Sequence, residues 1–380
     1  MELRIPLMRR LTEDGFRVAT VGPDPGEAFV AHEFEYHRYP LKRTLDPLAD
    51  WRATGFLERL FREHRPDLVH SVDMEPSPLV PAAAARAGVP ACVRTITGMG
   101  ALFSSASPKA LAMRLLYRRI QRRVVRDCQI TVFQNFDDQQ YFLDHNLVSA
   151  GTDRLVLSLG LDVETYVATA GGPTAQSALR NELGLDGGPV ITMVSRLSRP
   201  KGIAEYLEAA SLVRARDPRI TFLLIGHEVH QDPAAFPSAL VHRCPDVRFL
   251  GQRADVPTLL AISDLFVLPS YMREGVPQVL LEAAAVGLPL VTTDSPGCRE
   301  VVRHGENGVL VPARDGQALA STIFDLLADP ARRRRMGQAN RELVAENFHL
   351  DIVAEAYARI YRQALDIGEK QHARETRRAA

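Results

Sequence analysis

The strongest constraint on the fold is the alternation of short apolar segments with helical patterns along nearly the whole chain. Residues 190–195, 220–225 and 265–268 are runs of branched and aromatic side chains, and helical patterns separate them. Strands that read as continuous apolar runs are buried on both faces, and strands joined through helices pair in parallel. The sequence therefore predicts an α/β fold with parallel sheets that helices cover on both faces.

Two such series are separated by residues 165–177, TYVATAGGPTAQS, a segment rich in Gly, Ala and Thr. We interpret this segment as a linker between two doubly wound, Rossmann-like domains that face each other across a cleft. The expected bounds are 1–165 and 172–347, and an amphipathic helix over about 348–368 completes the first domain. In such domains ligands bind beyond the carboxyl ends of the strands.

The beginning of the chain departs from this pattern. A doubly wound domain normally opens with a strand and a glycine-containing turn, but MELRIPLMRRLTEDGF begins directly on a helical pattern. We therefore expect the first strand of the first domain to be missing, through either a start codon placed too late or a real truncation.

Composition excludes several classes of protein. The 380 residues have a formal net charge of zero, so no overall positive field favours nucleic acid. Four scattered cysteines form no CxxC pair, and eleven histidines show no paired spacing with a third ligand, so no metal site is predicted. No charge-free run approaches the length of about 18 residues that a membrane-spanning helix requires.

The loop SRLSRPKG, residues 195–202, lies between an apolar strand and a helix. At the carboxyl end of that strand, Arg196 and Lys201 could both face an anion, and the helix N-terminus adds partial positive charge. The alternative is an ordinary solvated basic loop. The loop has too few glycines to form a Walker-type phosphate cradle.

A second polar segment, REGVPQVLLE, follows the strand predicted at 265–268. Pro277 suits the first turn of a helix, where the missing N–H costs no hydrogen bond. The neighbouring amides could then bind a phosphate or a sugar hydroxyl. Glu274 precedes this turn, and Glu282 lies inside the helix among apolar residues. The alternative is that Glu274 caps the helix electrostatically while Glu282 faces water.

Taken in order, VSRLSRPKG, EGVPQVLLE, GLPLVTTDSPGCREVV and HGENGVLV resemble retaining glycosyltransferases of the family 4 type, which have the GT-B fold of two facing Rossmann-like domains. The resemblance implies that Arg196, Lys201 and Glu274 are catalytic, with the two cations on the diphosphate and Glu274 on the donor sugar. It implies that Glu282 binds the ribose and that Arg253 lies at the edge of the base. The implied donor-binding set also includes Gly275, Val276, Pro277, Gln278 and Val279.

The resemblance implies a nucleotide-sugar substrate, expected to be a UDP-sugar such as a UDP-N-acetylhexosamine, and no separate cofactor. A leaving nucleoside diphosphate gains negative charge, and fixed cations with a helix N-terminus can stabilise it without a metal. Within the family, the sequence is similar to transferases that extend undecaprenyl-diphosphate-linked sugars. The expected acceptor is therefore a lipid-linked or other glycan in cell-surface polysaccharide assembly.

On the acceptor side, the loop RTITGMGALFSS (94–105) follows a strand and precedes a basic helix at 108–127. The helix carries seven Lys and Arg residues, and an apolar stripe is expected at Met113, Leu116, Ile120 and Val124. It could rest on an anionic membrane surface, pair with an acceptor diphosphate, or be an ordinary surface helix. The candidate acceptor-side residues are Thr95, Thr97, Gly98, Gly100, Arg118 and Arg122.

The sequence therefore predicts a metal-independent glycosyltransferase with no nucleic-acid partner. We expect it in the cytoplasm, peripheral on the inner face of the plasma membrane. One alternative remains open. If the first strand is truly absent, the chain is an inactive or weak homologue that binds a nucleotide or a protein partner.

Overall fold

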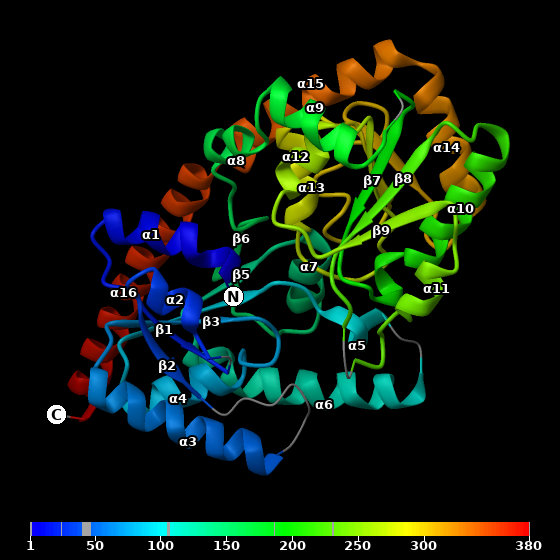
Figure 1. Ribbon diagram of the computed structural model, residues 1–380. Helices are drawn as coiled ribbons and strands as arrows, with labels where there is room; N and C mark the ends of the chain where they lie inside the picture. The colour runs from blue at the N-terminus through cyan, green and yellow to red at the C-terminus, as the bar shows by residue number, and fades with distance from the viewer. Residues whose placement is uncertain are drawn as a thin grey trace. The chain divides into compact units, whose positions relative to one another are not determined.

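The computed structural model describes residues 2–23, 25–39, 47–104, 107–185, 187–229 and 232–379, which form two compact units (Figure 1). Unit 1 comprises Met1–Gly160 and Leu350–Ala380, and unit 2 comprises Leu161–His349. Each contains a parallel sheet with helices, which confirms the predicted α/β class.

Unit 2 is built on a six-stranded parallel sheet with the order β12-β11-β10-β7-β8-β9. Its strands are β7 (Val190–Val194), β8 (Thr221–Ile225), β9 (Val247–Gly251), β10 (Leu265–Leu268), β11 (Leu290–Thr293) and β12 (Gly308–Val311). The chain adds β8 and β9 on one side of β7, and then returns to add β10, β11 and β12 on the other. The strand order therefore reverses between β7 and β10, and such a switch point is where doubly wound sheets bind ligands.

The helices of unit 2 surround this sheet (Figure 1). They are α8 (Val163–Thr169), α9 (Pro173–Glu182), η3 (Arg199–Lys201), α10 (Ile203–Arg216), α11 (Ser238–His242), α12 (Val256–Ala261), α13 (Gln278–Ala285), α14 (Gly316–Ala328) and α15 (Pro330–Asn347). The expected linker at 165–177 is instead largely helical, because α8 and the start of α9 occupy it. Glycines 171 and 172 separate these two helices, and the whole segment belongs to unit 2.

Unit 1 contains two parallel sheets, of order β1-β2 and β3-β4-β5-β6. The strands are β1 (Ala19–Gly22), β2 (Glu35–Arg38), β3 (Leu68–Val72), β4 (Ala91–Ile96), β5 (Ile130–Phe133) and β6 (Asp153–Leu155). The helices are η1 (Glu2–Arg4), α1 (Ile5–Glu13), α2 (Glu27–Ala31), α3 (Pro47–His64), α4 (Leu79–Ala87), α5 (Gly100–Ser104), α6 (Pro108–Val124), η2 (Val125–Asp127), α7 (Phe136–Asp144) and α16 (Leu350–Ala379).

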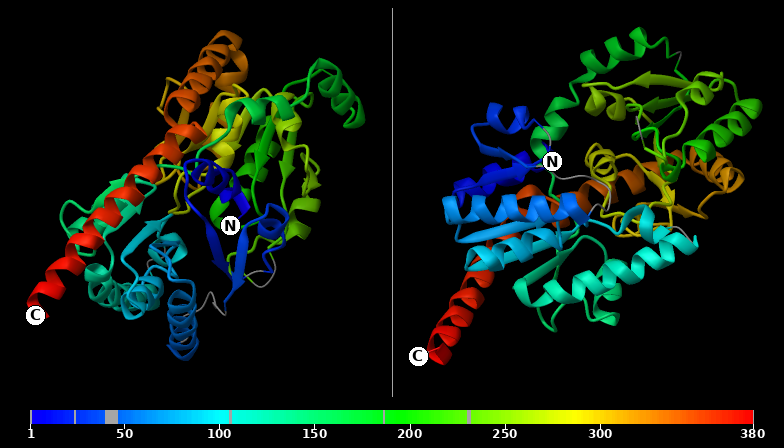
Figure 2. Two further views of the ribbon diagram at one scale, coloured as in Figure 1. Left: turned by 90° about the vertical axis from the view of Figure 1, so that its left-hand side faces the viewer. Right: turned by 90° about the horizontal axis from the view of Figure 1, so that it is seen from below.

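The last helix, α16, is part of unit 1 although it follows unit 2 in the sequence (red in Figure 2). Its buried side chains pack with α1, β4 and β5 in one apolar cluster. A second cluster joins α3 and α4 to β3 and β4. The four-stranded sheet is therefore covered by α1 and α16 on one face and by α3 and α4 on the other.

Helix α6 buries only part of the apolar stripe named above. Val124 is buried and Leu116 is 47% exposed, whereas the polar Gln121 is fully buried. Gln121 is turned inward because it accepts a hydrogen bond from the fully buried guanidinium of Arg94 on β4. Burying a charge without hydrogen-bond partners costs roughly several kcal/mol. The pairing of Arg94 with Gln121 therefore decides which residues of α6 are buried, more than the apolar pattern does.

Candidate functional site

The centre of the candidate site is an ion pair at the switch point of unit 2. Lys201 lies just after β7, and Glu274 lies in the loop that follows β10. Lys201 Nζ donates to both carboxylate oxygens of Glu274, over 2.7 and 2.8 Å. The two side chains are only 11% and 20% exposed. The structure thus brings together two residues that are 73 positions apart, at the sheet edge where the topology predicts a ligand.

The loop that carries Lys201 is held by backbone hydrogen bonds. The amide of Leu197 donates to the carbonyl of His227, and that of Arg199 donates to the carbonyl of Ala234. Gly202 has φ +81°, and a Cβ there would overlap the carbonyl oxygen of Pro269. Helix α10 begins at the next residue, so its positive end lies beside the Lys201 backbone. These restraints fix the cation before any ligand arrives.

The loop that carries Glu274 is fixed from two sides. Ser270, which is fully buried, donates through its hydroxyl to Glu274 Oε1 over 3.1 Å. Gly297, in the segment DSPGCRE after β11, has φ +90°, and its Cα packs against the carbonyls of Glu274 and Gly275. A side chain at that glycine would overlap both carbonyl oxygens. Ser270 was not among the predicted site residues, although it directly follows the strand and Pro269.

Helix α13 begins at Gln278, as predicted, but Pro277 precedes its first turn instead of lying within it. Pro277 is the N-cap, with φ −63° and ψ 117°, and the first helical residue is Gln278. Gly275 and Pro277 are buried, while Val276, Gln278 and Val279 are partly exposed. An α-helix leaves the amides of its first turn without an intrahelical acceptor. The predicted anion-binding end of this helix therefore stands directly after Glu274.

Glu282 lies one turn into α13 and is partly buried. Burial raises its pKa, and a hydrogen bond from Tyr166 opposes that rise. The hydroxyl of Tyr166, in α8, donates to Glu282 Oε2 over 3.3 Å. Glu282 therefore does not simply face water. The sequence analysis missed Tyr166 because it lies in the segment interpreted as a linker; a lone aromatic residue among Ala, Gly and Thr was the available signal.

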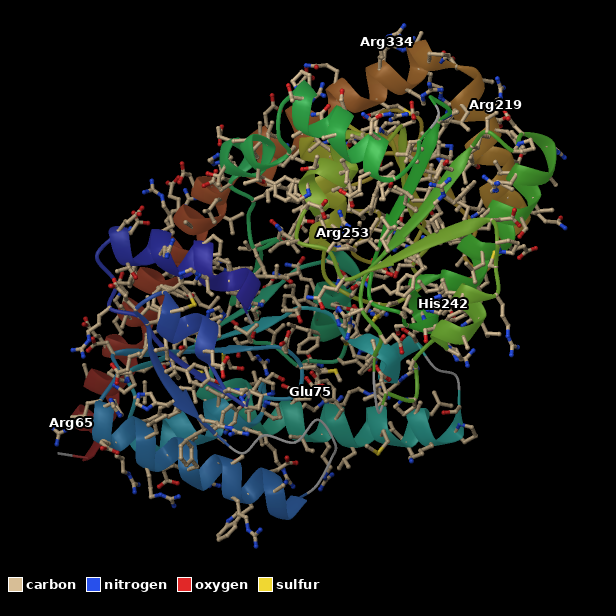
Figure 3. The ribbon with its side chains drawn as sticks, in the orientation of Figure 1. Arg65, Glu75, Arg219, His242, Arg253 and Arg334 are labelled. Carbon is tan, nitrogen blue, oxygen red and sulfur yellow. The ribbon has the colours of Figure 1, made fainter. Side chains whose placement is uncertain are left out.

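The two remaining predicted donor residues differ from each other. Arg196 is exposed, and its guanidinium makes no hydrogen bond or ion pair with the described residues. Arg253, labelled in Figure 3, lies between β9 and α12. It is bound to Asp255 over 2.6 and 2.8 Å and to Glu182 over 3.3 Å. These hydrogen bonds raise its pKa. Arg253 is thus a restrained cation, whereas Arg196 can move towards a ligand.

A hollow at the opposite end of the same sheet does not belong to this site. Its lining includes Gly188 and Pro189, just before β7, and Ser263 and Asp264, just before β10. These residues lie at the amino ends of the strands. Because doubly wound sheets bind ligands beyond their carboxyl ends, Lys201 and Glu274 rather than this hollow mark the candidate site.

In unit 1, the predicted acceptor-side residues divide into two groups. Thr95, on β4, is fully buried, and its hydroxyl lies 2.7 Å from His70 Nε2 and 3.4 Å from the hydroxyl of Tyr357. It is an interior residue, so the prediction that its side chain meets an acceptor does not hold. Thr97 instead is partly exposed and donates to Asp73 Oδ1.

Asp73 was missed by the sequence analysis. It directly follows β3, as Thr97 directly follows the adjacent β4, and it has φ +81°, a conformation that L residues rarely adopt. Gly98 and Gly100 also have positive φ values, 150° and 56°, and between them Met99 is fully buried. Together these residues form a polar turn at the carboxyl end of the four-stranded sheet. Strain of this kind is often found at functional sites.

Helix α6 presents both apolar and basic side chains to solvent. Leu111, Leu115 and Leu116 are 50%, 61% and 47% exposed. Arg122 is exposed and donates through Nε to the carbonyl of His145. Arg118 Nε is buried and has no hydrogen-bond partner among the described residues. The outer surface of α6 is therefore amphipathic and basic.

Two models of known families match the chain. A family model described as "Glycosyl transferases group 1" matches residues 175–343, which include Lys201, Glu274 and Glu282. A second model, described as "Glycosyl transferase 4-like domain", matches residues 6–155. The two matches together span most of the chain, one within each unit.

Individual relatives have related names. The chain is 23% identical over 367 residues, 94% of each protein, to N,N'-diacetylbacillosaminyl-diphospho-undecaprenol alpha-1,3-N-acetylgalactosaminyltransferase of Campylobacter jejuni. It is 28% identical over 300 residues to GDP-mannose-dependent alpha-(1-6)-phosphatidylinositol monomannoside mannosyltransferase of Mycolicibacterium smegmatis, covering 77% of this chain and 75% of that protein.

Solved structures share the fold. The crystal structure of HepE from Anabaena in complex with UDP and glucose superposes with a TM-score of 0.78 at 21% identity, covering 94% of this chain and 95% of that one. Sucrose-phosphate synthase from Thermosynechococcus elongatus gives a TM-score of 0.74 at 23% identity, covering 94% and 91%.

Proposed function

We propose that unit 2 binds a UDP-sugar. The chain belongs to the glycosyltransferases of the family 4 type, which have the GT-B fold. The sugar is transferred with retention of configuration to a lipid-diphosphate-linked or other glycan acceptor in polysaccharide assembly. The observation that carries the donor assignment is the shielded Lys201–Glu274 pair at the switch point of the unit 2 sheet.

The residue types fit the charge changes of the reaction. As the glycosidic bond of the donor breaks, the bonding electron pair stays with the diphosphate, which gains negative charge. Lys201, the movable Arg196 and the first-turn amides of α13 can meet that charge without a divalent metal. Positive charge grows at the anomeric carbon of the sugar, and the carboxylate of Glu274 is the neighbouring anion.

The ion pair also has a positioning role. Because Lys201 holds both oxygens of Glu274 and Ser270 supports one of them, the carboxylate has a fixed orientation. A ligand hydroxyl can still donate to it, since each oxygen accepts more than one hydrogen bond. Glu282, restrained by Tyr166, is suited to accept hydrogen bonds from the ribose.

The base of the donor nucleotide differs among the similar proteins. One relative named above uses GDP-mannose, and the solved structure of HepE contains UDP. A panel of UDP- and GDP-sugars should be tested for the rise in melting temperature that ligand binding to the folded state produces. UDP-N-acetylhexosamines are expected to stabilise wild-type protein but not Lys201→Ala.

Transfer should then be measured with the stabilising donor and an undecaprenyl-diphosphate-linked sugar. Transfer with inverted configuration, or stabilisation by GDP-sugars alone, would contradict the corresponding part of the proposal. Donor binding without transfer to any lipid-linked or free glycan would favour the alternative that this chain is a nucleotide-binding homologue.

None of the described helices is both long enough and apolar enough to cross a membrane. For the site of action we propose that the outer surface of α6 rests on an anionic bilayer. Leu111, Leu115 and Leu116 would enter the interface, while Arg119 and Arg123, both exposed, would meet lipid phosphates.

The bilayer proposal can be tested by co-sedimentation with vesicles of phosphatidylcholine, with and without phosphatidylglycerol. Binding should require the anionic lipid and weaken with salt, since surface charges are screened. Leu115→Gln with Leu116→Gln should reduce it, whereas Leu240→Gln, at a leucine of unit 2 that is 44% exposed, should not. Equal binding by both variants would contradict the proposal.

A further inference from the structure

A second cluster of chemically reactive side chains lies in unit 1, apart from the residues discussed so far. It consists of Glu35 and His37 on β2 and of His64 at the end of α3. One ligand atom from each residue lies within 4.8 Å of the other two. His37 Nε2 is 2.9 Å from Glu35 Oε1, and His64 Nδ1 is 3.4 Å from the same oxygen.

The local structure explains how these residues meet. Successive side chains of a strand point to opposite faces, so Glu35 and His37, two positions apart, share one face of β2. Helix α3 ends at His64, and Arg65, which is labelled in Figure 3, follows it. Arg65 has φ +46°. The two imidazole rings are tilted by 60° to each other, with centroids 4.5 Å apart. The distance in sequence between His64 and the strand explains why histidine spacing alone predicts no metal site.

The geometry matches the ligand set of a zinc ion. Zinc in proteins is commonly tetrahedral, with bonds of about 2.0–2.2 Å to imidazole nitrogen and carboxylate oxygen, so neighbouring ligand atoms lie roughly 3.3 Å apart. The distances of 2.9 and 3.4 Å to Glu35 Oε1 are close to that spacing. Two imidazoles and one carboxylate also leave a fourth position for water, as in other three-ligand zinc sites.

The charges around the cluster are favourable for a cation. Glu35 supplies a carboxylate whose Oε1 lies near a nitrogen of each imidazole. His64 lies in the last turn of an 18-residue helix, whose C-terminal end carries partial negative charge. Arg17 is the opposing cation, but it is 3.7 Å from Glu35 Oε2 and its side chain is 94% exposed. It therefore leaves Oε1 to the metal and can move away.

We propose that Glu35, His37 and His64 bind one Zn²⁺ ion, with water as the fourth ligand. The ion would join β2 to the end of α3. This matters for the two-stranded sheet in particular, because β1 and β2 pair only with each other among the described strands. The role that follows is stabilisation of this part of unit 1, in addition to the sugar transfer proposed for the molecule.

The direct test is zinc binding by tag-free protein, measured in competition with a chromogenic chelator. Wild-type protein should bind one equivalent. Loss of a supporting hydrogen bond typically lowers metal affinity by roughly 10- to 100-fold, and loss of a direct ligand should cost at least as much. His64→Ala, His37→Ala and Glu35→Gln should each show this loss. His32→Ala, at an exposed histidine of the same unit, should bind like wild type.

A second measurement separates lost ligation from lost folding. Zinc should raise the melting temperature of wild-type and His32→Ala protein, but not that of His64→Ala, because only binding to the folded state stabilises it. The variants should retain the wild-type circular dichroism spectrum without metal. Wild-type protein that binds no zinc, or a His64→Ala variant that binds it as tightly as wild type, would overturn the proposal.

Discussion

The carboxyl edges of the two main sheets are prepared for ligands in different ways. In unit 2, the loops after β7 and β10 present a shielded ion pair, Lys201–Glu274, that buried hydroxyls and close glycine contacts hold in place. In unit 1, the turns after β3 and β4 present the exposed carboxylate of Asp73, which accepts a hydrogen bond from the hydroxyl of Thr97. The neighbouring polar residues of β3 and β4 point into the interior instead.

This difference indicates a division of work. A charged diphosphate with a developing negative charge requires fixed cations and dipoles, and their preorganisation is what accelerates a reaction. An acceptor hydroxyl is neutral and requires only an oxygen that accepts its hydrogen bond. Unit 2 has the first arrangement, and the turn formed by Asp73 and Thr97 has the second. The following predictions test this comparison, beginning with the largest expected effect.

Replacing either member of the ion pair should nearly abolish transfer. Lys201→Ala and Glu274→Gln should each lower kcat by roughly 10²–10³, the typical loss on removing one group that stabilises transition-state charge. Because the two side chains bind each other, the double variant should lose less than the product of the single effects. Initial rates at saturating donor and acceptor measure this coupling.

Two comparisons sharpen this result. Glu306→Gln, at a carboxylate that is 69% exposed in unit 2, should leave the rate unchanged. Arg196→Ala should also reduce kcat strongly, but its effect should multiply with that of Glu274→Gln, since no recorded contact joins these two side chains. Near-wild-type rates for Lys201→Ala, or strict multiplication of the two ion-pair variants, would refute the assigned roles.

The interior polar residues of unit 1 should make its stability sensitive to acid. Burial, with a smaller effect from Arg4, lowers the pKa of His70 to about 3, whereas an unfolded histidine has a pKa of 6.5. Between these values the unfolded chain binds a proton that the folded unit excludes. The free energy of unfolding should therefore fall as the pH decreases from 6.5 towards 3, by about 1.4 kcal/mol per pH unit.

Chemical denaturation across this range, read by hydrogen exchange in each unit, would measure the slope. His70→Gln should remove it from unit 1. His242→Gln, at an exposed histidine of unit 2 labelled in Figure 3, should change nothing. An unchanged slope in the His70 variant would show that other groups cause the acid sensitivity.

Local sequence patterns predict the strands of this molecule that are buried on both faces of their sheet. Strands β7 and β10 are continuous apolar runs, and their positions followed from that pattern. Strand β2, Glu-Tyr-His-Arg, was not predicted, because it is largely polar and none of its side chains is fully buried. The apolar stripe of α6 did not reveal which residues are buried, because Gln121 turns inward to a charge on β4 that is 27 residues away.

The candidate site could also be predicted only in part from the sequence. Both Lys201 and Glu274 could be selected from the sequence, since each follows a strand and lies near a helix start. Their direct contact, the support from Ser270 and the bond from Tyr166 to Glu282 could not, because only the fold brings these residues together. The inward orientation of Thr95 likewise depends on His70 and Tyr357.

The exposed turn of unit 1 should affect the acceptor alone. Thr97→Val removes the hydroxyl that orients Asp73, and a hydrogen bond worth about 1 kcal/mol corresponds to roughly a fivefold change in affinity. The KM for acceptor should rise by that factor, while the melting-temperature shift caused by donor remains. Thr95→Val should instead lower stability and leave this KM unchanged, because its hydroxyl serves the interior. A raised KM for acceptor in Thr95→Val together with an unchanged KM in Thr97→Val would reverse the roles of the two threonines.

The smallest effect is expected at Tyr166, whose contact with Glu282 is long, at 3.3 Å. Tyr166→Phe removes the donor that restrains the carboxylate and opposes the rise in its pKa. A weak hydrogen bond of about 0.6 kcal/mol predicts roughly a threefold increase in the KM for the nucleotide sugar, with kcat nearly constant, since Glu282 is assigned to the ribose and not to the reacting bond. Tyr271→Phe, at a partly buried tyrosine of the same unit, is the matched control. A fall in kcat with unchanged KM would place Glu282 at the reaction centre and so remove the distinction between its role and that of Glu274.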